Sequence, residues 1–222
     1  MLGIVFDLDG TLIDSTPDLL AAINAVLPRH NLPPSDRQEN FSLAGNGLSS
    51  MFALTLERRV PSWGREKKEQ LEAEMLSLYR AEPATYSVSF PGILSLLEAI
   101  HDQGIPIGII SNKHVVMTQR ILDVHFPSIT FFRVYGIDSG FEPKPDASSL
   151  LDFKASLGFS EELIYVGDTE IDYETARGVA DRIYLATWGY RGSDALLAQG
   201  IDGSLLVRDT AQLACALDIR IS

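Results

Sequence analysis

Residues 2–14 read LGIVFDLDGTLID, an apolar run that leads into two aspartates, Asp7 and Asp9, followed by Gly10. Residues two apart in a strand point to the same side of a sheet, so the two carboxylates share a face if the strand continues through both. Gly10 permits a sharp turn just beyond them, at the carboxyl end of the strand. Neighbouring carboxylates repel each other and need a cation, a shared proton or both. An ordinary Asp-Gly turn is the alternative interpretation, and the rest of the chain must decide between them.

The region from about Pro91 onward alternates short β-rich runs with helical patterns, which is typical of parallel βαβ units. Strands are predicted over residues 105–110, 130–136, 162–167 and 182–187. Helices are predicted over residues 91–104, 114–124 and 146–157, from near Ile171, and over 209–217. We therefore expect an α/β fold with a Rossmann-like parallel sheet.

The region between Thr16 and Tyr86 has a different pattern. Residues 17–30, 47–60 and 65–82 are all helical in their spacing of apolar side chains, and no convincing strand lies between them. We expect a helical domain inserted after the first strand: residues 1–14 and 87–222 form the core, and residues 15–86 form a helical cap.

The composition limits the possible partners. Of the 222 residues 45% are hydrophobic, which permits a sizeable core, and the net charge is −12. This charge argues against nucleic-acid and anionic membrane partners, so an anionic substrate needs a local positive site. Cys215 is the single cysteine, which excludes an internal disulfide, and its apolar neighbours predict that it is buried. The sequence shows no signal-peptide pattern and no apolar segment that approaches the ~18 residues of a membrane span, so we expect a cytoplasmic protein. The oligomeric state, monomer or homodimer, stays open.

Four groups of polar residues each lie just after a predicted strand. If the strands are parallel, the four groups converge on one edge of the sheet. They are Asp7, Asp9 and Thr11; Ser111, Asn112 and Lys113; Lys144, between two prolines; and Asp168 and Asp172.

The chemistry of these groups is complementary. The four aspartates form an oxygen-rich cluster suited to Mg²⁺, which prefers a few carboxylates together with phosphate oxygens. Lys113 and Lys144 supply positive charge, and Ser111 and Asn112 supply a hydroxyl and an amide. A site with these components is suited to neutralising a phosphoryl group, which one carboxylate then attacks.

The ordered set DLDGTLIDS, SNK, KP and GDTEID resembles the haloacid dehalogenase superfamily, and specifically its Mg²⁺-dependent phosphatases with a helical cap. The resemblance covers nearly the whole chain. It implies that Asp7 is the nucleophile that forms an aspartyl-phosphate, and that Asp9 is the general acid and base. Ser111 would hold a phosphoryl oxygen, and Lys144 would offset negative charge. Mg²⁺ would be held by Asp7, the backbone carbonyl of Asp9 and Asp168, with Asp172 acting through water or the second shell.

A finer resemblance bears on the substrate. The segment around Gly45, Asn46 and Gly47 looks like the cap loop of phosphoglycolate phosphatases, and residues 186–202 resemble their tail. A plain turn between helices is an equal alternative for the loop. By this resemblance those three residues, with Thr11, Asn112 and Lys113, are expected to bind a small phosphorylated metabolite.

Several rival functions share the same motifs. A β-phosphoglucomutase-like phosphomutase uses the same acids, but its cap carries an arginine after the loop glycine that GNGLSSMF lacks. A pyrophosphatase or nucleotidase of the same fold is a further alternative. A phosphonatase needs a cap lysine with a lowered pKa, which the charged surroundings of Lys67 and Lys68 oppose. A catalytically idle binding protein of this fold has no support, because all the acids and Lys144 are present.

Overall fold

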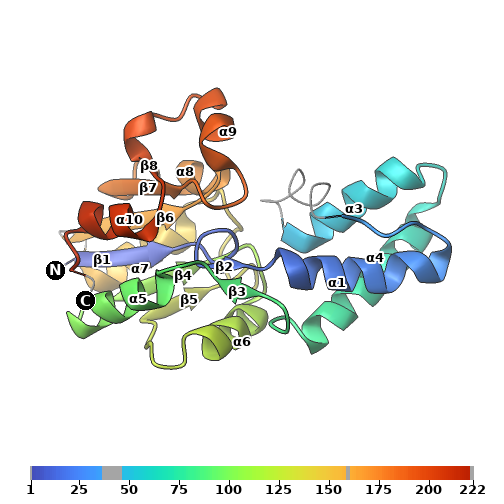
Figure 1. Ribbon diagram of the computed structural model, residues 1–222, viewed down its shortest axis with the longest axis horizontal. Helices are drawn as coiled ribbons and strands as arrows, with labels where there is room; N and C mark the ends of the chain where they lie inside the picture. Colours follow the sequence, from blue (N-terminus) through green and yellow to red (C-terminus); the bar gives the residue numbers. More distant parts are fainter. Residues whose placement is uncertain (1, 37–46, 159–160, 221–222) are drawn as a thin grey trace. The chain divides into compact units, whose positions relative to one another are not determined.

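The computed structural model describes residues 2–36, 47–158 and 161–220. The chain divides into two compact units (Figure 1). The core unit is Met1–Asp14 with Val88–Ser222, and the helical unit is Ser15–Ser87. Each is described by itself below.

The core unit is built on a six-stranded parallel sheet with the order β5-β4-β1-β6-β7-β8. Its strands are β1 (Leu2–Phe6), β4 (Ile107–Ile110), β5 (Arg133–Tyr135), β6 (Glu162–Gly167), β7 (Arg182–Ala186) and β8 (Leu206–Val207). A short antiparallel pair, β2 (Ile13–Asp14) and β3 (Val88–Ser89), lies at the two points where the chain leaves and re-enters this unit. The predicted α/β fold with a Rossmann-like parallel sheet is confirmed.

The central strand β1 is apolar throughout because both of its faces are covered. Ile4, Val5 and Phe6 are completely buried, although successive side chains point to opposite sides of the sheet. Its neighbours β4 and β6 pair with it in parallel, so the carboxyl ends of three strands lie next to one another. The loops after these ends carry most of the predicted site residues.

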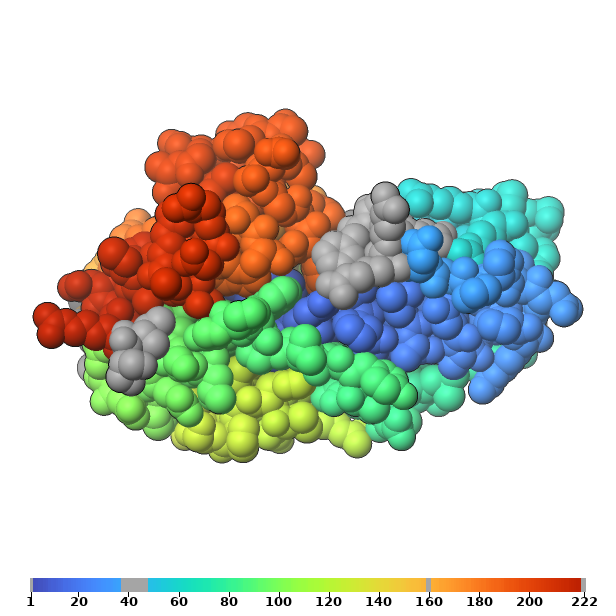
Figure 2. All heavy atoms as spheres, viewed as in Figure 1, coloured from blue at the N-terminus to red at the C-terminus, as the bar shows by residue number. Residues whose placement is uncertain are grey.

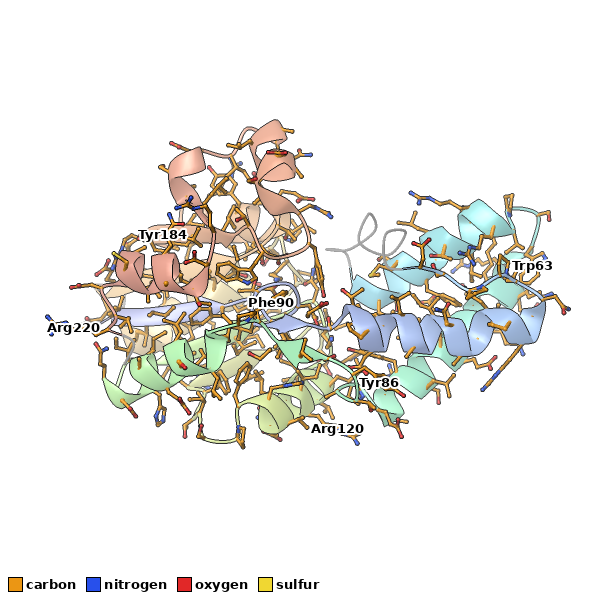
Figure 3. All side chains as sticks on the ribbon, viewed as in Figure 1. Trp63, Tyr86, Phe90, Arg120, Tyr184 and Arg220 are labelled. Carbon is orange, nitrogen blue, oxygen red and sulfur yellow. The ribbon has the colours of Figure 1, made fainter. Side chains whose placement is uncertain are left out.

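Helices cover the sheet of the core unit. They are α5 (Ile93–Asp102), α6 (Val115–His125), α7 (Ser148–Leu157), α8 (Glu170–Ala176), α9 (Gly192–Ala198) and α10 (Thr210–Leu217), with the 3₁₀ turn η2 (Gly203–Leu205). In Figure 2, atoms of α5 (green) and α10 (red) lie on the face of the core unit that is turned to the viewer. Tyr184 of β7, labelled in Figure 3, donates a hydrogen bond from its hydroxyl to the carbonyl of Ala216 at 3.1 Å.

Helix α7 packs against the sheet at two glycines. The ring of Phe153 lies directly over Gly108 of β4, where a methyl group would overlap it. In the same way, the side chain of Leu157 lies where a methyl group on Gly3 of β1 would be. Phe153 is completely buried. The absence of two side chains therefore sets how closely this helix approaches the strands that carry the site.

The predicted elements of the core unit from β4 to β7, and helix α10, are confirmed within a few residues. Helix α9 and the short strands β2, β3 and β8 were not predicted. The predicted burial of Cys215 is wrong, because its side chain is exposed. Helix α10 turns Leu213, Ala214 and Leu217 toward the core, and a residue at position 215 lies off that stripe.

The helical unit contains α1 (Thr16–Val26), the 3₁₀ turn η1 (Leu27–His30), α3 (Gly47–Arg59) and α4 (Arg65–Ala81). Its first helix is tied to its last residues by Asp18. This carboxylate, 3% exposed, accepts hydrogen bonds from the backbone N–H groups of Thr85, Tyr86 and Ser87 at 3.1, 2.8 and 2.7 Å, and from the Ser87 hydroxyl. Across the residues that the structure describes, none of the helices has both the length and the apolar character needed to span a membrane.

Candidate active site

Three of the predicted acids form a buried cluster in the core unit. Asp7 follows β1, Asp168 follows β6, and Asp172 lies in the first turn of α8. One carboxylate oxygen of each lies within 4.8 Å of one oxygen of both others. Asp7 is 6% exposed and the other two are fully buried. The parallel pairing of β1 with β6 brings these residues together across more than 150 positions of sequence.

Lys144 places its ammonium group between two of these carboxylates. Its Nζ donates to Oδ1 of Asp7 at 2.6 Å and to Oδ1 of Asp172 at 2.7 Å. Burial lowers the pKa of Lys144, but the charges of Asp172 and Asp7 outweigh burial and hold it well above its usual value. The lysine is therefore a permanent cation, and it balances part of the negative charge.

The acids of the cluster differ in their affinity for protons. Burial raises the pKa of Asp7 to about 7, against the opposing effect of Lys144. Burial, together with the charges of Asp172 and Asp7, also raises the pKa of Asp168 well above its usual value. One lysine thus does not neutralise the cluster. Three converging carboxylate oxygens with unbalanced negative charge suit a divalent cation with a preference for oxygen ligands, so this donor set fits Mg²⁺.

Asp172 is held by hydrogen bonds at both of its oxygens. Oδ1 accepts from Lys144 and from the hydroxyl of Tyr165 at 3.0 Å. Oδ2 accepts from the backbone N–H groups of Asp168 and Thr169 at 3.2 and 3.1 Å, and from the Thr169 hydroxyl at 2.7 Å. Burial raises the pKa of Asp172, but Lys144 and these donors lower it by a larger amount, so the net shift of the pKa is downward. Five donors leave Asp172 few lone pairs for a metal ion, and its predicted role beyond the direct metal ligands stays a prediction.

Asp9 is placed apart from this cluster. Its side chain, 22% exposed, accepts a hydrogen bond at Oδ1 from Nζ of Lys113 at 2.9 Å. Lys113 itself is buried to 8% exposure. The prediction that Asp9 binds metal concerns its backbone carbonyl and stays a prediction. The predicted substrate contact of Lys113 likewise stays a prediction, and the structure adds its ion pair with Asp9.

The other predicted residues of the core unit also lie at this edge of the sheet. Ser111 is buried directly after β4. The side chain of Asn112 pairs with the backbone of Lys144: its amide donates to the carbonyl at 3.0 Å and its oxygen accepts from the N–H at 2.8 Å. The hydroxyl of Thr11 lies 3.4 Å from Oδ1 of Asp168, to which it donates. Asn112 and Thr11 therefore position site residues, and their predicted contacts with substrate stay predictions.

The predicted residues of the cap loop are Gly45, Asn46 and Gly47. Gly45 and Asn46 lie outside the described residues, and Gly47 is the first residue of α3 in the helical unit. Their predicted role in substrate binding stays a prediction.

Sequence reasoning missed two contributors to the site. Tyr165 reads as one more apolar residue of β6, yet its hydroxyl reaches Asp172; a buried tyrosine hydroxyl usually has a partner, which is the available signal. The second contributor is a backbone group, which no residue type can reveal: the N–H of Tyr190 donates to Oδ2 of Asp168 at 2.6 Å.

Comparison with known proteins agrees with this geometry. The family model described as haloacid dehalogenase-like hydrolase matches residues 4–182, which include every acid of the site. The chain belongs to the haloacid dehalogenase-like hydrolase family. Its predicted membership is thereby confirmed.

Relatives within the haloacid dehalogenase-like family share most of the length of this chain. A phosphoglycolate phosphatase of Cereibacter sphaeroides is 34% identical over 191 residues, which are 86% of this chain and 87% of that protein. One from Xanthomonas campestris is 32% identical and covers 95% of this chain and 94% of its own. A crystal structure of a predicted phosphoglycolate phosphatase from Haemophilus somnus superposes with a TM-score of 0.84 at 25% identity, covering 97% of both chains. The predicted enzyme class, a phosphatase, is confirmed.

Proposed function

We propose that this phosphatase is a Mg²⁺-dependent phosphomonoesterase that acts on a small phosphorylated metabolite through an aspartyl-phosphate on Asp7. The observation that carries the proposal is the buried cluster of Asp7, Asp168 and Asp172, bridged by Lys144. The names of the relatives make 2-phosphoglycolate the first substrate to test. We also propose residues 15–86 as a cap domain and a cytoplasmic location, as the sequence predicts.

The metal would be held by the side chains of Asp7 and Asp168 and by the backbone carbonyl of Asp9. When bound, Mg²⁺ would neutralise charge on the phosphoryl oxygens. Residues of the chain orient the nucleophile and bind the phosphoryl group. Lys144 favours the anionic form of Asp7 and holds it in place, since its ammonium group hydrogen-bonds to Oδ1 of that carboxylate. Ser111 would hold a phosphoryl oxygen by its hydroxyl.

The reaction would proceed in two steps. A carboxylate oxygen of Asp7 attacks phosphorus, the bond from phosphorus to the leaving oxygen breaks, and protonated Asp9 gives its proton to that oxygen. Asp9, now a carboxylate, takes a proton from water. The resulting hydroxide attacks phosphorus, the bond to Asp7 breaks, and inorganic phosphate leaves. Asp9 can reach both the leaving group and water because its side chain is partly exposed.

Two substitutions test the roles of the acids. Asp7→Asn should abolish hydrolysis of 2-phosphoglycolate and of p-nitrophenyl phosphate, each assayed with and without Mg²⁺. Asp9→Asn should still accept the phosphoryl group from p-nitrophenyl phosphate, whose leaving group needs no proton, but should release it slowly. Mass spectrometry of acid-quenched Asp9→Asn protein should then find a phosphoryl group on Asp7.

Asp123→Asn is the matched control, because it makes the same chemical change at an exposed helical position. Full activity of Asp7→Asn, or full activity of the wild type without any divalent ion, would refute the mechanism. A panel of 2-phosphoglycolate, sugar phosphates, nucleotides and pyrophosphate tests the substrate class. Consumption of a sugar phosphate without release of phosphate would favour the phosphomutase instead.

A further inference from the structure

The carboxylate of Asp168 is enclosed by two loops that come from distant parts of the core unit. One is the turn at Gly10, after β1, and the other contains Gly189, after β7. A methyl group on either glycine would overlap the carboxyl group of Asp168. At Gly189 the same methyl group would also overlap the carbonyl oxygen of Gly10. The side chain of Asp168 is therefore restricted from two sides at once.

The loop after β7 also fixes one carboxylate oxygen directly. The backbone N–H of Tyr190 donates to Oδ2 of Asp168 at 2.6 Å, a short distance for a hydrogen bond to a charged acceptor. The hydroxyl of Thr11 donates to the other oxygen, Oδ1, at 3.4 Å. The backbone of one loop and the side chain of the other thus define how this carboxylate is oriented.

The same loop is attached to the site on both sides of Tyr190. Before it, the indole Nε1–H of Trp188 donates to the backbone carbonyl of Thr11 at 3.1 Å. After it, the guanidinium of Arg191 forms a two-pronged ion pair with Glu170, with distances of 2.8 and 3.0 Å. Glu170 opens helix α8, two residues after Asp168. Such paired contacts with a carboxylate fix geometry as well as charge.

We propose that residues 187–191 are a positioning segment for metal binding, in which Trp188 and Arg191 hold the loop that orients the carboxylate of Asp168. The inference rests on the proposed function, since it concerns the divalent ion that Asp168 would hold. Neither side chain is placed in contact with substrate. Their effect on the ion would pass through the Tyr190 N–H and Gly189. Partners of metal ligands typically change metal affinity by about 10- to 100-fold when they are lost.

The test uses Trp188→Phe, which keeps an aromatic ring but removes the N–H donor, and Arg191→Gln, which removes the two-pronged ion pair. Mn²⁺ binding is measured without substrate from the electron paramagnetic resonance signal of the free ion. Each variant should bind Mn²⁺ about 10-fold or more weakly than the wild type. Both should regain most of the wild-type kcat at high Mg²⁺ with little change in the substrate KM, because the segment acts on the ion.

Arg182→Gln is the matched control. Arg182 also pairs with a glutamate, Glu162, at 2.7 Å, but both residues lie at the amino-terminal ends of their strands, away from the acids. This control should bind Mn²⁺ like the wild type. A merely structural role would lower the thermal stability of Trp188→Phe and Arg191→Gln and leave Mn²⁺ affinity unchanged.

Two failures are distinguishable. If the wild type binds Mn²⁺ and both variants bind it equally well, the positioning role is refuted and the proposed phosphatase mechanism stands. If the wild type binds no divalent ion, the metal dependence fails, and the inference fails with it.

Discussion

Replacing Lys144 by Met tests how much of the core unit's stability depends on charge balance in the site. Nζ of Lys144 lies 2.6 Å from Asp7 and 2.7 Å from Asp172, and its side chain is 5% exposed. Methionine matches the length of the lysine stem but leaves both carboxylates buried without their cation. Removing one partner of a buried ion pair typically costs about 3–5 kcal/mol. We expect Lys144→Met to lower the free energy of unfolding by about 3–5 kcal/mol at neutral pH without metal.

The loss should depend on pH in a defined direction. In the wild type, Lys144 helps to hold the pKa of Asp172 below its usual value, so this acid stabilises the fold above its unfolded pKa and the contribution fades as pH falls. Without the lysine, burial raises the folded pKa, and the folded variant takes up protons that the unfolded chain does not. The deficit should therefore be large at about pH 8 and small at about pH 5. Mg²⁺ should recover part of it by supplying positive charge.

Fluorescence can report the core unit alone. The chain has two tryptophans, Trp63 in the helical unit and Trp188 in the core unit. In a Trp63→Phe background, guanidinium unfolding followed by fluorescence therefore monitors Trp188. Lys154→Met is the control, since the carboxylate that loses its lysine there, Asp181 at 3.2 Å, is half-exposed and is solvated by water, so the ion pair contributes about 1 kcal/mol or less. A loss at Lys144 no larger than at Lys154, or one that is the same at both pH values, would refute the reasoning.

Three further predictions concern separate parts of the chain. Asp18→Asn removes a charged acceptor of four hydrogen bonds and should destabilise the helical unit by about 2–3 kcal/mol, measured by Trp63 fluorescence in a Trp188→Phe background. Mg²⁺ binding should release at least about half a proton at pH 7, because the pKa of Asp7 is about 7 and metal requires the carboxylate; calorimetry in two buffers of different ionisation enthalpy measures this. Gly108→Ala should cost about 1–3 kcal/mol by overlap with Phe153, and Phe153→Leu should relieve part of that added cost in the double variant.

The parts of the fold that the sequence predicts are those with a strong local signal. The strands β4, β6 and β7 are apolar runs of four to six residues with turns beside them, and parallel pairing then forces their carboxyl ends to one edge. Short strands lack such a signal: β8 is Leu206–Val207 and exists because Leu185 and Ala186 of β7 lie beside it. Cys215 shows the same limit, since apolar neighbours along the chain do not say which way a helix turns its side chains.

The site follows the same division between local and long-range information. Strand ends and residue type predict that four acids meet: Asp7, Asp168 and Asp172 do, whereas the side chain of Asp9 pairs with Lys113 instead. Residue type does not predict the partner of each polar group. Asn112 has the chemistry to bind a substrate, but its amide pairs with the backbone of Lys144, 32 positions away. Trp188 likewise reaches the carbonyl of Thr11 across 177 positions of sequence.

Hydrogen-bond donors distinguish acids that look equivalent in the sequence. Among the described residues, Asp172 accepts from five donor groups, Asp168 from two side-chain or backbone donors, and Asp7 from Lys144 alone. An oxygen whose lone pairs are occupied has little left for a metal ion or a phosphorus atom. The capacity to bind a metal ion or to attack phosphorus is therefore lowest for Asp172, which positions Lys144, and intermediate for Asp168. It is highest for Asp7, which keeps most of its oxygen lone pairs. A second hydrogen-bond donor to Asp7 should therefore lower the reactivity of this carboxylate toward phosphorus and stabilise the fold. Removing a donor from Asp172 should not have this combined effect.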